Sequence, residues 1–277
     1  MIDADKPGTA VSDGTMTLAT LSNLARIPAG DFLMGSASAE DDERPVHRVF
    51  VSEFLIGRFP VTNDEYAKFV RATGCPAPSI RELPLIATGG RDSSFRELAA
   101  RYAWSDGQPP AGQISHPVVL VRYDDALAYC HWLSDEVGRV IRLPTEAEWE
   151  KAARGGLEAQ RYPWGEDMSP SRCNFLTDPL LKGQRGTRPT GTYPPNAYGL
   201  CDMSGNVWDW VSDWYGPDYY GVGDVRDPRG PDAGNLRVVR GGSWVNDDVS
   251  MLRSACRHKV PPDTYAPSIG FRVAASA

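Results

Sequence analysis

The first clear periodicity in the chain is helical and begins near residue 62. Thr62 and Glu65 have the spacing of a capping box, in which each side chain accepts a hydrogen bond from the other residue's backbone N–H. Tyr66 and Phe69 follow on one face, and Gly74 can supply the left-handed conformation that commonly ends a helix. We therefore expect an amphipathic helix that ends at Gly74.

Two further helices are predicted downstream. Apolar positions three and four residues apart predict a helix from near Asp124 to Gly138, with Cys130 as a core thiol. Residues 144–148 contain a second capping box, and Gly155 ends the helix that follows. We interpret the glutamates of this third helix as structural carboxylates that favour its positive end or pair with arginine one turn on.

Strands are predicted where the pattern alternates or where glycines punctuate short apolar runs. Residues 27–36 give short strand-like pieces around two glycines, and residues 46–57 alternate between apolar and polar side chains. Near the C-terminus, residues 237–240 read as a strand that enters a glycine turn, and residues 269–273 form another apolar run.

Between these elements the chain is rich in loops. Residues 1–24 are small and polar and predict a poorly ordered tail. Residues 75–115 predict a long surface excursion with a short helix near residues 93–101, and the acidic run 40–43 predicts a solvated loop.

The most constrained stretch is 191–216, GTYPPNAYGLCDMSGNVWDWVSDWYG. Its turn formers, such as Pro194 and Gly205, alternate with large aromatic residues, such as Trp208 and Trp210. This much aromatic area is unfavourable in water, so we expect these turns to wrap a core.

Composition narrows the class of protein. Eight Trp and 41% hydrophobic residues among 277 argue against disorder, while 27 Gly and 23 Pro favour a loop-rich fold. The formal net charge of −7 disfavours nucleic-acid binding. The sequence shows no membrane-spanning apolar window or export signal, and its five cysteines form no CxxC pair. We expect a monomeric, cytoplasmic protein with reduced thiols and no membrane partner.

Oxygen ligands for a metal gather in the same constrained stretch. Asn206, the backbone carbonyl of Val207 and Asp209 lie within one short bend, and calcium prefers such oxygens. The alternative is that Asn206 holds the turn and Asp209 accepts hydrogen bonds from nearby amides.

Several motifs of this chain resemble the formylglycine-generating enzyme family, also called the sulfatase-modifying-factor domain. They are IPAGDFLMGS at 27–36, RLPTEAEWEKAARGG at 142–156, GLCDMSGNVWDW at 199–210, RVVRGGSW at 237–244 and IGFRV at 269–273. The resemblance implies a single α+β domain over residues 25–277, irregular and loop-rich, with a fold of the C-type-lectin kind. It also implies a second calcium site that starts at Asn174, although the aspartate expected about a dozen residues later is absent.

The resemblance also suggests what chemistry is missing. Formylglycine-generating enzymes use two cysteines to bind copper(I), and Asn246 and Met251 stand at the corresponding positions. Neither residue is a thiolate, and copper(I) needs soft thiolate or thioether sulfur, so we expect no copper and no formylglycine generation by that mechanism. The alternative is a replacement copper site of Cys256, Met251 and His258, although a buried cysteine at this position is more often a packing residue. Cys256 and Ser243 are the candidate catalytic residues that remain, although Ser243 has no identifiable base.

Two functions from different classes follow from the resemblance. One is a diverged oxidoreductase that oxidises or matures a peptide or amino-acid-derived substrate. The other is a non-catalytic ligand-binding module of the C-type-lectin type, similar to the variable proteins of diversity-generating retroelements, with a peptide, protein or small molecule as its ligand. The candidate ligand-binding residues are Trp244, Asn246, Asp247, Asp248, Met251, Cys256, His258 and Tyr265.

Overall fold

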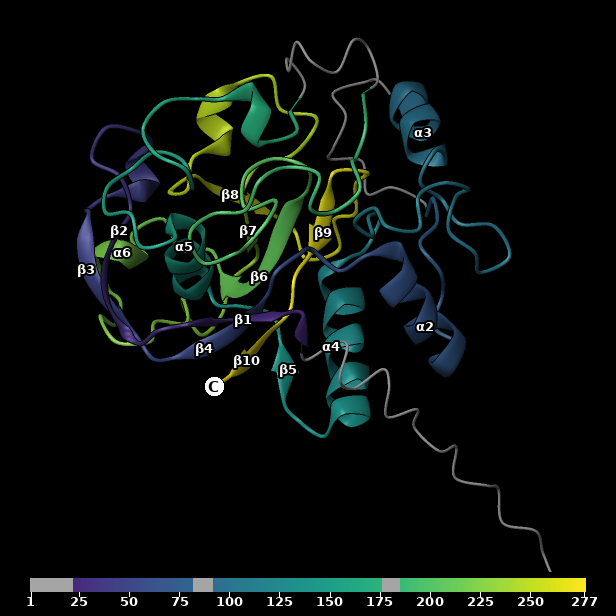
Figure 1. Ribbon diagram of the computed structural model, residues 1–277, viewed down its shortest axis with the longest axis horizontal. Coiled ribbons are helices and arrows are strands. Elements are labelled where there is room, and N and C mark those ends of the chain that lie inside the picture. The colour runs from purple at the N-terminus through teal and green to yellow at the C-terminus, as the bar shows by residue number, and fades with distance from the viewer. Residues whose placement is uncertain (1–21, 82–91, 176–184) are drawn as a thin grey trace, which may run out of the picture.

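The computed structural model describes residues 22–81, 92–175 and 185–277 of the chain (Figure 1). Within these ranges the strands form three small sheets, ordered β1-β4-β10-β5, β2-β3 and β8-β7-β6-β9. Pairing is antiparallel except between β6 and β9, which run parallel. The strands are β1 (Leu24–Ile27), β2 (Gly30–Met34), β3 (His47–Val51), β4 (Phe54–Gly57), β5 (Ile141–Arg142), β6 (Trp208–Trp214), β7 (Arg237–Arg240), β8 (Arg257–Val260), β9 (Ile269–Phe271) and β10 (Ala274–Ser276).

The three predicted helices are present with the predicted ends. They are α2 (Asn63–Thr73), α4 (Tyr123–Val137) and α5 (Glu146–Arg154). Capping boxes begin α2 and α5, and a left-handed glycine follows each of the three helices. The local sequence signals at these helix ends therefore agree with the tertiary structure.

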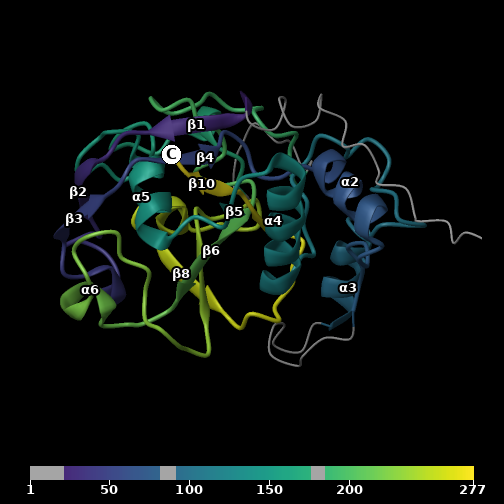
Figure 2. The same ribbon diagram turned by 90° about the horizontal axis from the view of Figure 1, so that it is seen from below.

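The helices lie on different sides of the sheets. Figures 1 and 2 show α2, α3 (Asp92–Ala100) and α4 together at one side, whereas α5 lies among the strands. Short helical turns connect the remaining elements. They are η1 (Asp41–Glu43), η2 (Pro170–Arg172), α6 (Tyr219–Val222) and η4 (Val249–Leu252).

Aromatic side chains fill the core between the helices and the sheets. Tyr66 of α2 stacks on Tyr129 of α4 with ring centroids 5.7 Å apart, and Phe271 of β9 meets Tyr129 edge-on at 5.4 Å. Trp149 of α5 is fully buried in a second cluster beside β2 and β3. The aromatic residues near 208–210 join this core as predicted, but they do so as the seven-residue strand β6, which the turn signals around it concealed.

Other predictions meet the structure with mixed results. The tail prediction falls mostly on residues outside the described ranges, and its last residue, Leu24, begins β1. The short helix predicted near residues 93–101 is α3. No helix in the described part of the chain is long and apolar enough to cross a membrane.

The solvated loop predicted for residues 40–43 is wrong for two of its members. Asp41 is exposed, but Glu43 is fully buried and Asp42 is partly buried, with 10% of its side chain exposed. Arginine and lysine side chains from the C-terminal region reach these two carboxylates, which neutralises their charge in the interior.

Candidate functional site

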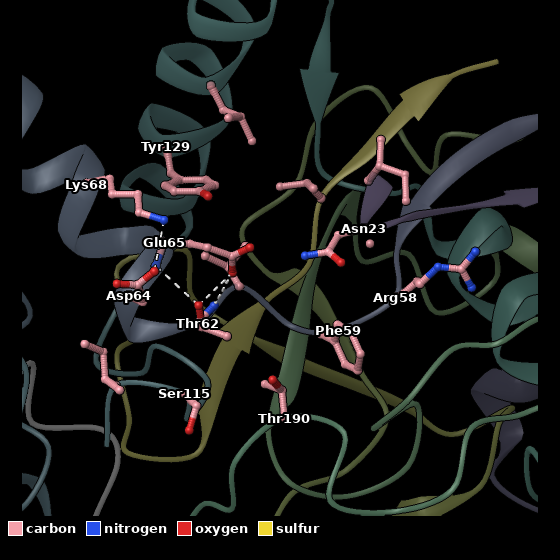
Figure 3. A pocket seen from close by; sticks show the side chains of 16 residues that line it. Asn23, Arg58, Phe59, Thr62, Asp64, Glu65, Lys68, Ser115, Tyr129 and Thr190 are labelled. Carbon is pink, nitrogen blue, oxygen red and sulfur yellow. Dashed lines mark hydrogen bonds and ion pairs between the residues drawn. The ribbon is translucent and has the colours of Figure 1, made fainter. Parts of the chain in front are cut away.

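The cavity of about 830 Å³ between α2, α4 and the β1-β4 edge contains none of the predicted site residues (Figure 3). Its carboxylates already have partners. Glu65 accepts hydrogen bonds from Thr62, and Asp64 pairs with Lys68 at 2.9 Å. These contacts stabilise the start of α2.

A second cavity, of about 490 Å³, gathers three of the predicted ligand-binding residues, and we call it the Met251 pocket. It lies where η1, the segment after β6, η4 and β8 meet. Its lining residues are Glu40, Asp41, Asp42, Tyr215, Pro217, Asp218, Ser250, Met251, Arg253, Cys256, Arg257, His258 and Lys259.

A neighbouring cavity of about 670 Å³ shares part of this wall. Glu40, Ser250 and Arg253 line both cavities, so the short helix η4 lies between two adjoining hollows. Asp248, another predicted ligand-binding residue, lines the larger of the two. Together the two cavities could accommodate an extended ligand.

The backbone of this wall depends on a glycine turn after β7. Gly242 has φ +73°, and a Cβ atom there would come within 2.5 Å of the Leu252 side chain. Gly241, with φ +99°, packs against the ring of Trp149 in the same way. A side chain at either position would be strained and crowded, so the RGG sequence fixes where η4 sits.

The ring of His258 packs against the ring of Trp208. Its ring lies 5.1 Å from the ring of Trp208, with an angle of 31° between the planes. Burial and the charge of Lys259 lower the pKa of His258, opposed by the charge of Asp42. These effects favour the neutral imidazole, which can accept or donate a hydrogen bond.

Asp42 carries the negative side of the pocket. One oxygen accepts from Tyr215 at 2.7 Å and from Lys259 at 2.8 Å, while the other is buried without a partner in the described residues. Burial alone would raise the pKa of Asp42, but the hydrogen bonds from Lys259 and Tyr215 lower it below its usual value. The pocket thus presents a carboxylate beside an ammonium group.

Buried arginines fix the wall behind the pocket. Arg253 binds Glu43 through two hydrogen bonds of 2.6 and 2.7 Å, and Arg257 binds Glu146 through two of 2.8 and 2.9 Å. Such two-point pairs fix the orientation of the arginine side chain and also neutralise its charge.

Arg240 is fully buried and ties the wall to α5. It donates to Glu150 at 2.5 Å and to the carbonyls of Ser254, Ala255 and Cys256 at 2.7 to 2.9 Å. Glu150 also accepts from Arg154, as the helical spacing predicted. The glutamates of α5 therefore have structural roles, with arginine partners that the sequence did not identify.

The two candidate catalytic residues are poorly placed for nucleophilic chemistry. Burial raises the pKa of the Cys256 thiol to about 12, so the reactive thiolate is scarce at neutral pH. The Ser243 hydroxyl is buried and donates to Asn246 at 3.0 Å, and no histidine contacts it among the described residues. Asn246 is occupied by this turn and lines neither cavity beside η4.

The other predicted ligand-binding residues lie apart from the pocket. Trp244 and Tyr265 are buried in a hydrophobic cluster with Tyr102, and the Trp244 indole donates to a backbone carbonyl. Both pack inside the fold in this structure, and their assignment as ligand contacts stays a prediction. Asp247 is exposed on the loop before η4.

The predicted calcium ligands have protein partners in the structure. The Asn206 side-chain oxygen accepts from Arg188 N at 2.9 Å and from Asn174 at 3.2 Å, and Asp209 pairs with Arg272 at 2.6 Å. One side-chain oxygen on each of Asn174 and Asp209 is buried without a partner in the described residues. These two oxygens are the ones that a cation could use, with Arg272 as a competitor for Asp209.

Comparison with known proteins establishes the family. The sequence profile described as the Sulfatase-modifying factor enzyme 1-like domain matches residues 12–277, so the chain belongs to this family. The chain is 38% identical over 284 residues to a formylglycine-generating enzyme of Streptomyces coelicolor, with 91% of this chain and 88% of that protein covered. It is 34% identical over 286 residues to the Inactive C-alpha-formylglycine-generating enzyme 2 of Bos taurus, with 92% and 88% covered.

Solved structures confirm the predicted α+β fold. PvdO from Pseudomonas aeruginosa is similar with a TM-score of 0.75 and 29% identity, and 92% of this chain and 94% of that chain are covered. Treponema denticola variable protein 1 has a TM-score of 0.71 and 24% identity, with 92% and 95% covered. At that identity the second likeness concerns the fold alone.

Proposed function

We propose that this chain binds a peptide or amino-acid-derived ligand in the Met251 pocket and does not generate formylglycine. The observation that carries the proposal is the convergence of Met251, Cys256 and His258 on one cavity, whose wall also holds the Asp42–Lys259 ion pair and the carboxylates of Glu40, Asp41 and Asp218. Amino acids and peptides carry both charges and apolar side chains, and such a wall suits them.

The absence of formylglycine generation rests on residue chemistry. Asn246 and Met251 stand where the resemblance places the copper-binding cysteines. The only thiol that lines the pocket among the described residues is Cys256, whose pKa is raised to about 12. The catalytic form of the proposal is therefore a diverged oxidative or maturation reaction on the bound ligand.

The alternative is a non-catalytic binding module with the same pocket. The low reactivity expected of the two candidate nucleophiles favours this alternative. Cys256 is a buried thiol, and Ser243 is hydrogen-bonded to an amide that cannot act as a base.

Binding is tested by selecting a random peptide library on the immobilised protein and titrating the recovered peptides. The Met251→Trp variant, whose indole fills part of the pocket, should weaken binding at least about tenfold. Val140→Trp, a change at an exposed position outside the cavities, is the control. Equal binding by all three proteins would contradict the location. Incubation of the bound peptide with oxygen, followed by mass spectrometry, then separates the enzyme from the binding module.

A further inference from the structure

A third cavity, of about 410 Å³, is lined by basic residues although the chain as a whole is acidic. We call it the His116 pocket. Arg101 follows α3, His116 precedes a buried strand-like run, and Arg185 and Arg188 come from a third segment. No aspartate or glutamate stands among the lining residues that the structure describes, although the chain has a formal net charge of −7.

Backbone and side-chain hydrogen bonds hold the three segments together. Arg101 donates to the carbonyl of Arg185 at 2.9 Å, and Gln113 donates to the carbonyl of Arg101 at 3.2 Å. His116 Nδ1 and the Thr187 hydroxyl lie 2.9 Å apart. The pocket is therefore built by the fold, because each segment is fixed by contacts with another.

The cations around the pocket remain exposed to solvent. Arg101 and Arg185 are exposed, and neither forms an ion pair with a carboxylate of the described residues. Burial and the charge of Arg188 lower the pKa of His116, against the opposing effect of its Thr187 hydrogen bond. The described wall of the pocket therefore carries guanidinium groups and no carboxylate, which favours a positive potential there.

We propose that the His116 pocket binds a tetrahedral oxyanion, the phosphate or sulfate group of a ligand or the free ion. A guanidinium group offers a planar fork of donors that matches oxyanion geometry. Arg101, Arg185 and the hydrogen-bonded pair of His116 and Thr187 line the same cavity and together offer several donors. A group with three or four oxygens has more acceptors for these donors than a carboxylate has. This site is separate from the Met251 pocket and does not depend on the function proposed for it.

The test is calorimetric titration of the full-length protein with sodium sulfate at pH 7, with ionic strength held constant by chloride. Sulfate does not change its protonation near this pH, so the heats report binding. Wild-type protein should bind saturably, and Arg101→Gln and Arg185→Gln should each weaken binding at least about tenfold. Arg185 is exposed, so the melting temperature of Arg185→Gln should not change, whereas Arg101→Gln also loses the hydrogen bond to the Arg185 carbonyl and its melting temperature is measured alongside binding.

Arg71→Gln is the matched control, because Arg71 is an exposed arginine on α2 outside this pocket. Absence of saturable sulfate binding, or an equal loss in Arg71→Gln, would overturn the proposal. Inorganic phosphate and phosphoserine separate the two sources of the oxyanion. Tighter binding of phosphoserine identifies a group on a larger ligand, and equal binding identifies the free ion.

Discussion

The walls of the Met251 and His116 pockets use the same residue type in opposite ways. Behind the Met251 pocket, Arg253 and Arg257 each bind a buried carboxylate through two hydrogen bonds. Around the His116 pocket, Arg101 and Arg185 are exposed and lack such partners among the described residues. The charge of the first group is neutralised within the fold, whereas that of the second group is available to a ligand.

If the buried arginines depend on their carboxylate partners, the largest loss of stability should follow a substitution of Glu150. The Glu150→Gln substitution should destabilise the protein by about 3–5 kcal/mol, because Arg154 would keep a buried charge without a carboxylate and Arg240 would keep only its longer contact of 3.5 Å with Glu146. Chemical denaturation measures the loss. Glu158→Gln, on an exposed pair with Arg48, is the control and should change stability by less than about 1 kcal/mol. A similar small loss for Glu150→Gln would remove the distinction between the two groups of arginines.

Asp213 extends the comparison between paired and unpaired charges to a carboxylate. It is buried and lacks an arginine partner among the described residues. Burial and the charge of Glu146 raise its pKa from 3.8 to about 7, against its hydrogen bonds with Glu146 N and Ser212. The folded state therefore holds a proton that the unfolded state releases. This contribution is complete below about pH 4 and is lost as pH rises through about 7.

The Asp213→Asn variant should flatten this dependence, since asparagine does not titrate. Wild-type protein should lose stability on the order of a few kcal/mol relative to the variant between about pH 4 and pH 8. Denaturation of both proteins across this range measures the difference. Parallel curves would show that Asp213 is ionised in the folded protein throughout.

Adding calcium tests whether a metal ion can bind Asp209 while Arg272 is paired with it. We expect added calcium to raise the melting temperature, and a chelator to lower it, because Asn174 and Asp209 each keep an unpartnered buried oxygen. At a concentration of about 100 times Kd, the ion would add about 2.7 kcal/mol. Asn206→Ala should abolish the response. An unchanged melting temperature would mean that Arg272 alone balances Asp209.

The smallest effect on stability is expected for the exposed arginines of the His116 pocket. Arg185→Gln should change stability by less than about 0.5 kcal/mol, because the side chain is exposed and pairs with no carboxylate of the described residues. Thermal melting in chloride buffer measures this. A large loss would show that Arg185 supports the fold, as Arg253 does.

Local signals in the sequence were sufficient for much of the fold. The capping boxes at Thr62 and Thr145 involve residues three apart, and each terminating glycine follows its helix directly, so a short window predicts them. The strand β6 was missed because the turn formers and glycines before Trp208 outweighed the alternation within it.

The sites depend on contacts that no short window contains. Arg253 and Glu43 are 210 residues apart, and Arg257 and Glu146 are 111 apart. The acidic run near Glu43 therefore looked solvated from the sequence alone. The His116 pocket was missed for the same reason, because its arginines come from segments more than 80 residues apart that only the fold brings together.

The central proposal is that the chain binds a ligand in the Met251 pocket and does not generate formylglycine. The most direct test incubates the protein with copper(I), oxygen and a sulfatase-type peptide that contains cysteine, and follows the peptide by mass spectrometry. The formylglycine-generating enzyme of Streptomyces coelicolor is the positive control. The account predicts that the cysteine peptide is recovered unchanged. Conversion of its cysteine to the aldehyde would contradict the account and would require a copper site built without the expected pair of cysteines.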